Sequence, residues 1–229
     1  MSDECWTLHP SDFAFLWEEC RRCFYLKVVS GFPRARAPMP RIFSVIDARM
    51  KAWVEGRRTE TVVPGMPAGA FEHGERRVES APLDVPVPDH VYRCRLRGAL
   101  DALVRLDDGA WAVIDFKTAG RRDEHLARYA RQLHAYAWAL EQPAPGAFGV
   151  GPVRRLGLVV FEPEKFARDD GGAVGLAGGL AWLEVPRDDG AFLGFLSEVL
   201  SVLAQASPPG GAPMCPWCVY RDAGRRTGL

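Results

Sequence analysis

The stretch GALDALVRLDDGAWAVIDFKT, residues 98–118, decides how the chain is expected to fold. Apolar residues recur along it on both sides of Asp107-Asp108-Gly109, which is a typical hairpin turn sequence. We therefore predict two neighbouring antiparallel strands, over 91–106 and 110–117, and the rest of the chain is interpreted around them.

The length of the turn decides which residues of the two strands face each other. A two-residue loop places Ala102 opposite Asp115, whereas a three-residue loop with Gly109 in the left-handed conformation places Asp101 there. Only the three-residue loop gives a wholly apolar face, because side chains alternate between the two faces of a strand. We therefore predict that Asp101 and Asp115 lie side by side on the opposite face, with Lys117 one step further along. The apolar face holds Ala102, Val104, Leu106, Ala112, Ile114 and Phe116.

Two neighbouring carboxylates beside a lysine form a candidate metal site. Opposed strand residues have Cβ atoms roughly 5 Å apart, and two like charges at that distance need a cation between them. Carboxylate oxygens in an open site suit Mg²⁺ or Mn²⁺, which keep waters and bind substrate phosphate. The alternative is a simple ion pair between Asp115 and Lys117, and this alternative leaves Asp101 unexplained.

The remaining pattern predicts an α/β fold with a mixed central sheet flanked by helices. Apolar spacing predicts helices over 11–29, 41–55, 122–141 and 189–205. Further strands are expected over 75–80, 153–162 and 180–186, with a flexible, glycine-rich connection at 168–179. We expect one domain over 1–229, made of N-terminal helices (11–56), a core (75–206) and a C-terminal cysteine segment (207–229).

Composition excludes some classes of protein. The 229 residues are 48% hydrophobic and carry a formal net charge of zero. The net charge therefore does not by itself indicate a nucleic-acid partner. No apolar run is long enough to span a membrane, and Asp3 and Glu4 stand where a signal peptide would be basic. We therefore expect a cytoplasmic protein without membrane association. Lysine occurs at only four positions, which makes Lys117 inside a strand conspicuous.

Four of the six cysteines form two Cys-x-x-Cys pairs, Cys20/Cys23 and Cys215/Cys218. Disulfides are not expected in a cytoplasmic protein, and four thiolates suit either a tetrahedral Zn²⁺ or an iron–sulfur cluster. A shared metal would join the N-terminal and C-terminal segments. A redox-sensing metal is an alternative, but it requires exposed cysteines of low pKa.

Three motifs follow one another along the chain: Gly98-Ala99-Leu100-Asp101, Val113-Ile114-Asp115-Phe116-Lys117-Thr118 and Gln132-Leu133-His134-Ala135-Tyr136. In this order they resemble motifs of the RecB-type PD-(D/E)XK nucleases. The resemblance implies a restriction-endonuclease-like core and a metal-dependent hydrolysis of DNA that is single-stranded or carries an end. It implies that Asp101, Asp115 and the main-chain carbonyl of Phe116 bind the metal, and that Lys117 positions the attacking water.

The third motif implies further catalytic roles for Gln132 and Tyr136, which lie one turn apart on the predicted 122–141 helix. One feature departs from the family pattern. The usual metal-binding histidine on a helix before the sheet is absent from 41–55, and we predict that Asp47 replaces it.

The segment Cys20-Arg21-Arg22-Cys23-Phe24-Tyr25-Leu26 is similar to the cysteine region of the CRISPR-associated RecB-like exonucleases. This resemblance favours a [4Fe–4S] cluster over Zn²⁺, although those nucleases divide their cysteines one and three. It also implies DNA as a partner, with a helicase or larger DNA-processing complex as a candidate companion. The main alternative is a non-catalytic module of the same fold that binds nucleic acid or protein and has a degenerate acidic site.

Overall fold

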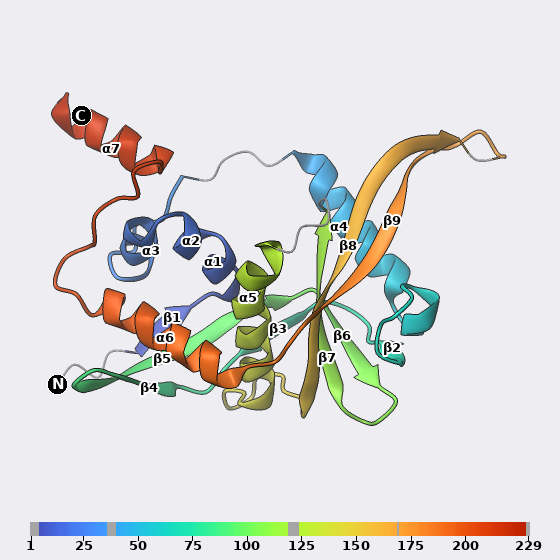
Figure 1. Ribbon diagram of the computed structural model, residues 1–229, viewed down its shortest axis with the longest axis horizontal. Helices are drawn as coiled ribbons and strands as arrows, with labels where there is room; N and C mark the ends of the chain where they lie inside the picture. Colours follow the sequence, from blue (N-terminus) through green and yellow to red (C-terminus); the bar gives the residue numbers. More distant parts are fainter. Residues whose placement is uncertain (1–4, 36–39, 119–123, 169, 228–229) are drawn as a thin grey trace.

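The structure is a computed structural model that describes residues 5–35, 40–118, 124–168 and 170–227. Asp3, Glu4 and the first two residues of the predicted 122–141 helix lie outside the described residues. Two mixed sheets are covered by helices, as Figure 1 shows. The predicted α/β class with a mixed sheet is therefore confirmed, although the predicted sheet is divided in two.

The larger sheet carries the hairpin that the sequence predicts. Its strand order is β2-β6-β7-β8-β9, in which β7 and β8 pair in parallel and the other neighbours pair antiparallel. The strands are β2 (Gly69–Phe71), β6 (Ala102–Leu106), β7 (Trp111–Thr118), β8 (Val153–Arg168) and β9 (Val174–Val185).

The smaller sheet is built around one long strand, β5 (His90–Leu100). It pairs in parallel with β1 (Cys5–Leu8), and antiparallel with β3 (Arg76–Glu79) and β4 (Leu83–Val87). A single strand over 91–106, as predicted, is therefore wrong. Leu100 pairs with Arg76 in the smaller sheet while Ala102 pairs with Ile114 in the larger one, so the chain changes sheets at Asp101.

The predicted hairpin register is confirmed. Ala102 pairs with Ile114 and Val104 with Ala112, and Gly109 has a φ of 83°, as a three-residue loop requires. The two faces of the hairpin enter two separate cores. Ala102, Val104 and Ile114 belong to a core on the α4 side, whereas Leu103 and Val113 belong to the main core.

The helices follow the predicted order, with differences in detail. The described helices are α1 (Pro10–Ala14), α2 (Leu16–Glu19), α3 (Arg21–Val28), α4 (Arg41–Val54), the 3₁₀ turn η1 (Thr59–Thr61), α5 (Glu124–Glu141), α6 (Asp189–Leu203) and α7 (Pro216–Arg226). α4 packs against β7, and α5 packs against α1 and β8. None of them has the length and apolar character that a bilayer crossing requires.

The predicted continuous helix over 11–29 is wrong, because it breaks at Phe15 and again at Cys20. Cys20 has an extended backbone, with φ −167° and ψ 107°, and it caps the start of α3. The break leaves Cys20 and Cys23 on the same short turn of chain, and both are buried. The interruption of the helix therefore places the thiols of Cys20 and Cys23 close together in a buried position.

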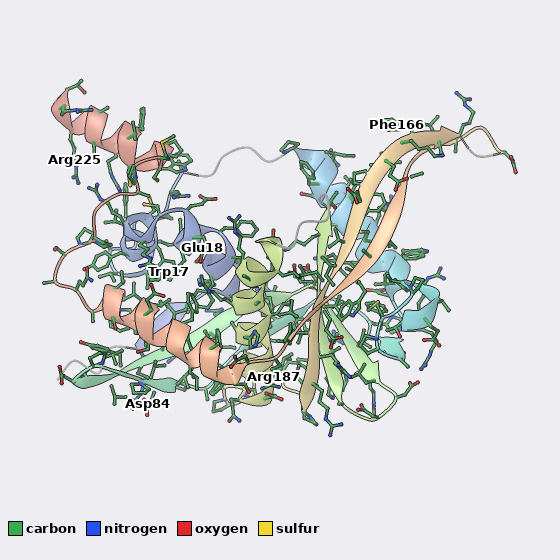
Figure 2. The ribbon with its side chains drawn as sticks, in the orientation of Figure 1. Trp17, Glu18, Asp84, Phe166, Arg187 and Arg225 are labelled. Carbon is green, nitrogen blue, oxygen red and sulfur yellow. The ribbon has the colours of Figure 1, made fainter. Side chains whose placement is uncertain are left out.

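The predicted flexible connection at 168–179 is largely strand instead. β8 and β9 form one long antiparallel hairpin that projects from the sheet, with Phe166 close to its end (Figures 1 and 2). Glycine makes this pairing feasible, because a Cβ on Gly178 would lie 2.0 Å from the carbonyl oxygen of Glu162. The glycines thus permit a close strand approach, where the sequence analysis takes them as a sign of flexibility.

Candidate functional site

Asp101 lies at the junction between the two sheets, and both of its carboxylate oxygens are held. Oδ2 accepts a hydrogen bond from the backbone amide of Phe116 at 3.0 Å. Oδ1 forms an ion pair with Lys51 Nζ of α4 at 2.7 Å. The amide of Phe116 in β7 thus holds Asp101 next to Asp115, which precedes Phe116 in the chain.

Asp115 is the most deeply buried charged group of the site, with 3% of its surface exposed. Its Oδ1 accepts a hydrogen bond from Gln132 Nε2 of α5 at 2.9 Å. Its Oδ2 forms an ion pair with Lys117 Nζ at 2.5 Å. Burial raises the pKa of Asp115 to about 7; the charge of Lys117 lowers the pKa and that of Asp101 raises it further.

Lys117 is enclosed between the carboxylate and aromatic rings. Its Nζ lies 4.4 Å from the ring centre of Tyr129 on α5, in addition to its ion pair with Asp115. Burial lowers the pKa of Lys117, but the attraction of Asp115 outweighs it and raises the pKa above its ordinary value. Lys117 is therefore held as a cation next to the carboxylates.

Gln132 and Tyr136 lie on the same face of α5, as their spacing predicts, and they contact different parts of the site. Tyr136 donates a hydrogen bond from its hydroxyl group to the carbonyl oxygen of Ala99 at 2.7 Å, so it holds the end of β5 just before Asp101. Gln132 Oε1 is buried without a hydrogen-bond partner among the described residues. α5 thus secures both aspartates, one directly and the other through the backbone.

The predicted substitute ligand, Asp47, lies near the same site. Lys51 Nζ contacts Asp47 Oδ2 at 2.9 Å and Asp101 Oδ1 at 2.7 Å, so one ammonium group bridges these two carboxylates. Glu75 Oε2 lies 3.5 Å from the same nitrogen. His73 is not part of this group; it is exposed and lies 3.8 Å from Glu55.

Lys51 and Glu75 are the two site residues that the sequence analysis misses. A signal for Lys51 was present, because lysine is scarce in this chain and Lys51 follows Asp47 by four residues on one helix. Glu75 has no comparable signal, because a loop brings it to the site.

The acidic residues fit a hard divalent cation. Two carboxylates face one site, and burial disfavours the charge of Asp115 unless a cation is near. Asp101, Asp115 and the Phe116 carbonyl would hold such an ion, with Asp47 as a further candidate. These assignments remain predictions.

The four cysteines of the two Cys-x-x-Cys pairs form a second group on the other side of the molecule from α4. Their sulfur atoms lie within 4.8 Å of one another, and all four residues are buried. The closest pairs are Cys20–Cys218 and Cys23–Cys218 at 3.6 Å and Cys23–Cys215 at 3.7 Å. None of the cysteines forms a disulfide, so the predicted grouping of N-terminal and C-terminal thiols is confirmed.

Positive and N–H groups surround these sulfurs. Arg34 Nη2 donates to Cys215 Sγ at 3.3 Å, Arg221 Nη2 donates to Cys218 Sγ at 3.5 Å, and the Ala212 amide donates to Cys20 Sγ at 3.5 Å. Hydrogen-bond donors aimed at sulfur stabilise thiolates, which are the metal-binding form of cysteine. The group is therefore suited to hold a metal.

No protein with a curated description matches the sequence. Among solved structures, the crystal structure of SSO0001 is similar with a TM-score of 0.52 at 17% identity, over 97% of this chain and 87% of that chain. At this identity the similarity supports the fold alone. The family model of the PD-(D/E)XK nuclease superfamily matches residues 34–223. That match spans both aspartates, Lys117 and the α5 motif, and the chain therefore belongs to the PD-(D/E)XK nuclease superfamily.

Proposed function

We propose that this protein is a metal-dependent deoxyribonuclease that hydrolyses phosphodiester bonds, with single-stranded or end-containing DNA as its substrate. The observation that carries the proposal is the constellation of Asp101, Asp115 and Lys117 at the junction of the two sheets. Membership of a nuclease superfamily supports the reaction class. DNA as the partner follows from the resemblance of the motifs.

A bound Mg²⁺ or Mn²⁺ would supply Lewis-acid polarisation of the phosphodiester and activation of the attacking water. The chain supplies the remaining functions. Asp101 and Asp115 present the carboxylate oxygens that would hold the ion, and Gln132 fixes the orientation of Asp115. Tyr136 fixes the backbone that carries Asp101.

Lys117 is the residue proposed to act on the substrate. As a cation it would attract a phosphate oxygen, and its nitrogen lies 2.5 Å from Asp115 Oδ2. A water near that oxygen would be within reach of both groups. Lys117 would therefore orient the nucleophile as a cation, because the raised pKa of its amine keeps it protonated.

Degradation of labelled single-stranded DNA in the presence of Mn²⁺ tests this proposal. Lys117→Ala and Asp115→Asn are each expected to lower the cleavage rate by at least about 100-fold, because each removes a group that acts on the scissile phosphate. Lys165→Ala, which removes a lysine of β8 outside the site, is the matched control and should retain activity. Equal, residual activity of wild type and Lys117→Ala across metals and substrates would contradict the proposal.

A non-catalytic binding module is the second candidate, and the ion pair between Lys51 and Asp101 favours it. An ammonium group that already neutralises Asp101 competes with a metal for the same oxygen. In that case the wild type would bind DNA without cleaving it, and Lys117→Ala would leave binding unchanged. Gel-shift and cleavage assays on the same samples separate the two candidates.

A further inference from the structure

The spacing of the four sulfur atoms bears on what they hold. In a tetrahedral site with zinc–sulfur bonds of about 2.3 Å, neighbouring sulfurs lie about 3.8 Å apart. The closest pairs here are at 3.6 and 3.7 Å, and all four sulfurs lie within 4.8 Å of one another. The arrangement already has the dimensions of a single-ion site.

A [4Fe–4S] cluster requires a wider arrangement. Each thiolate then binds its own iron at a corner of the cluster, so an entire inorganic core lies between the sulfurs. Gly211 packs directly against Cys218, where an added Cβ would lie 3.0 Å from Sγ, and Arg34 and Arg221 contact the sulfurs. The observed spacing of the sulfurs is therefore narrower than the cluster favoured by the sequence resemblance requires.

The charges around the sulfurs also match one divalent ion. Four thiolates around such an ion leave two negative charges. Arg34 and Arg221 bring two guanidinium groups into contact with the sulfurs, one on Cys215 and one on Cys218. Arg34 also pairs with Glu19 through its other terminal nitrogen, so it is shared between that carboxylate and the sulfur. Each of the two arginines has a buried Nε without a hydrogen-bond partner among the described residues, so the sulfur contacts are part of what holds these buried cations.

We propose that Cys20, Cys23, Cys215 and Cys218 bind one zinc ion, and that Arg34 and Arg221 stabilise it by neutralising the tetrathiolate. The zinc ion joins the start of α3 to the start of α7, whose first turn carries Cys218. It has no part in the hydrolysis, because the acidic site lies with α4, β7 and α5. The two arginines are positioning residues that act through the sulfurs.

Elemental analysis tests the identity of the metal. The full-length protein is purified without oxygen from cells supplied with both zinc and iron, and zinc, iron and acid-labile sulfide are measured per chain. We expect a colourless protein with about one zinc and no sulfide. A brown protein with iron and sulfide overturns the proposal, and so does a single iron in place of zinc.

Substitution of cysteines tests the ligand set. Cys218→Ser is expected to lose the zinc, whereas Cys5→Ser, which changes a cysteine outside the group, should retain it. Replacement by Co²⁺ in the wild type should give the intense visible absorption of a tetrahedral thiolate site. Full zinc content in Cys218→Ser contradicts the proposed ligands.

Substitution of the arginines gives a measurement that does not depend on folding of a cysteine variant. Arg34→Met keeps the aliphatic stem and removes the charge, so we expect zinc to pass to a coloured chelator about 10- to 100-fold faster. Arg22→Met is the matched control, because Arg22 lies in the same region but pairs with Asp222. Equal transfer rates in wild type and Arg34→Met overturn the role of the arginine.

Discussion

Lys51 is the residue that most changes the interpretation of the acidic site. Its ammonium group touches Asp47 and Asp101 at distances typical of strong ion pairs, and Glu75 lies slightly further away. Attraction to these carboxylates raises the pKa of Lys51 despite its partial burial. Lys51 thus occupies a position that a divalent cation would also prefer, and the two cations must compete for Asp101.

Lys51→Met is expected to strengthen the binding of Mn²⁺ at the acidic site. The substitution frees Asp101 Oδ1 and removes a positive charge, so the apparent dissociation constant should fall by at least about twofold. Calorimetric titration of the zinc-loaded protein with Mn²⁺ measures this change. Weaker Mn²⁺ binding in Lys51→Met would instead show that the lysine orders the site for the metal.

The burial of Asp115 predicts a pH dependence of stability in the absence of Mg²⁺ and Mn²⁺. The folded state raises the pKa from 3.8 to about 7, so it binds the proton more tightly than the unfolded chain does. This group therefore stabilises the fold below about pH 4, and that contribution is lost as the pH rises to about 7. The loss should amount to about 4 kcal/mol.

The free energy of unfolding of wild type relative to Asp115→Asn isolates this group, because the other titrating residues are shared. The difference should become less favourable to wild type between pH 4 and 7. Added Mg²⁺ should reduce the pH dependence by stabilising the carboxylate. A difference that is independent of pH in this window would exclude the raised pKa.

At the residue scale, the sequence predicts which strand residues lie together in the site, but it does not predict which side chains from other elements contact them. Alternation along the strands is sufficient to place Asp101 and Asp115 together, because only one register separates apolar from charged faces. The bridging role of Lys51 could not be derived, since it depends on how α4 packs against β7. Periodicity within one segment carries no information about such packing.

At the scale of the elements, the β8–β9 hairpin depends on glycine for strand contact. Gly178→Ala is expected to lower the free energy of unfolding by about 1–3 kcal/mol, because its Cβ would collide with the backbone carbonyl of Glu162. Gly175→Ala is the matched control on the same strand. A Cβ there meets no atom within 4 Å, so the change should stay within about 0.5 kcal/mol.

Chemical denaturation of the two variants measures this difference. Equal stability of Gly178→Ala and Gly175→Ala would mean that the strands separate at low cost near Glu162. The hairpin carries exposed apolar side chains at its end, with Phe166 exposed to 79%. The difference in stability between the two variants therefore also measures how strongly β8 and β9 pair near this exposed end.

Two of the differences between predicted and observed elements have a common physical cause. Helix 11–29 breaks at Cys20, and strand 91–106 divides at Asp101, although local apolar periodicity continues through both. Each break lies at a residue whose side chain has a partner distant in sequence: Cys218 for Cys20, and Lys51 for Asp101. Contacts of this kind override local preference. The paired cysteines predict the first contact, but apolar periodicity does not show that it interrupts the helix.

At the scale of the whole molecule, the two candidate sites are held by different parts of the fold. The acidic site lies where the two sheets meet, so elements from both sheets and from α4 and α5 fix it. The cysteine group joins α3 to α7, which lie close together in Figure 1 although they are far apart in the sequence. The order of the motifs along the sequence predicts the acidic site, and the two Cys-x-x-Cys pairs predict the cysteine group.

The distance in sequence between the two cysteine pairs has a consequence for how the protein is made. Cys20 and Cys218 are separated by 198 positions, so a ribosome must synthesise the residues between them before the second pair of thiols exists. Cys20 and Cys23 must remain reduced during that time if they are to bind a metal. A product that terminates before Cys215 could never complete the tetrathiolate, so metal binding there would distinguish chains that extend past Cys218 from shorter ones.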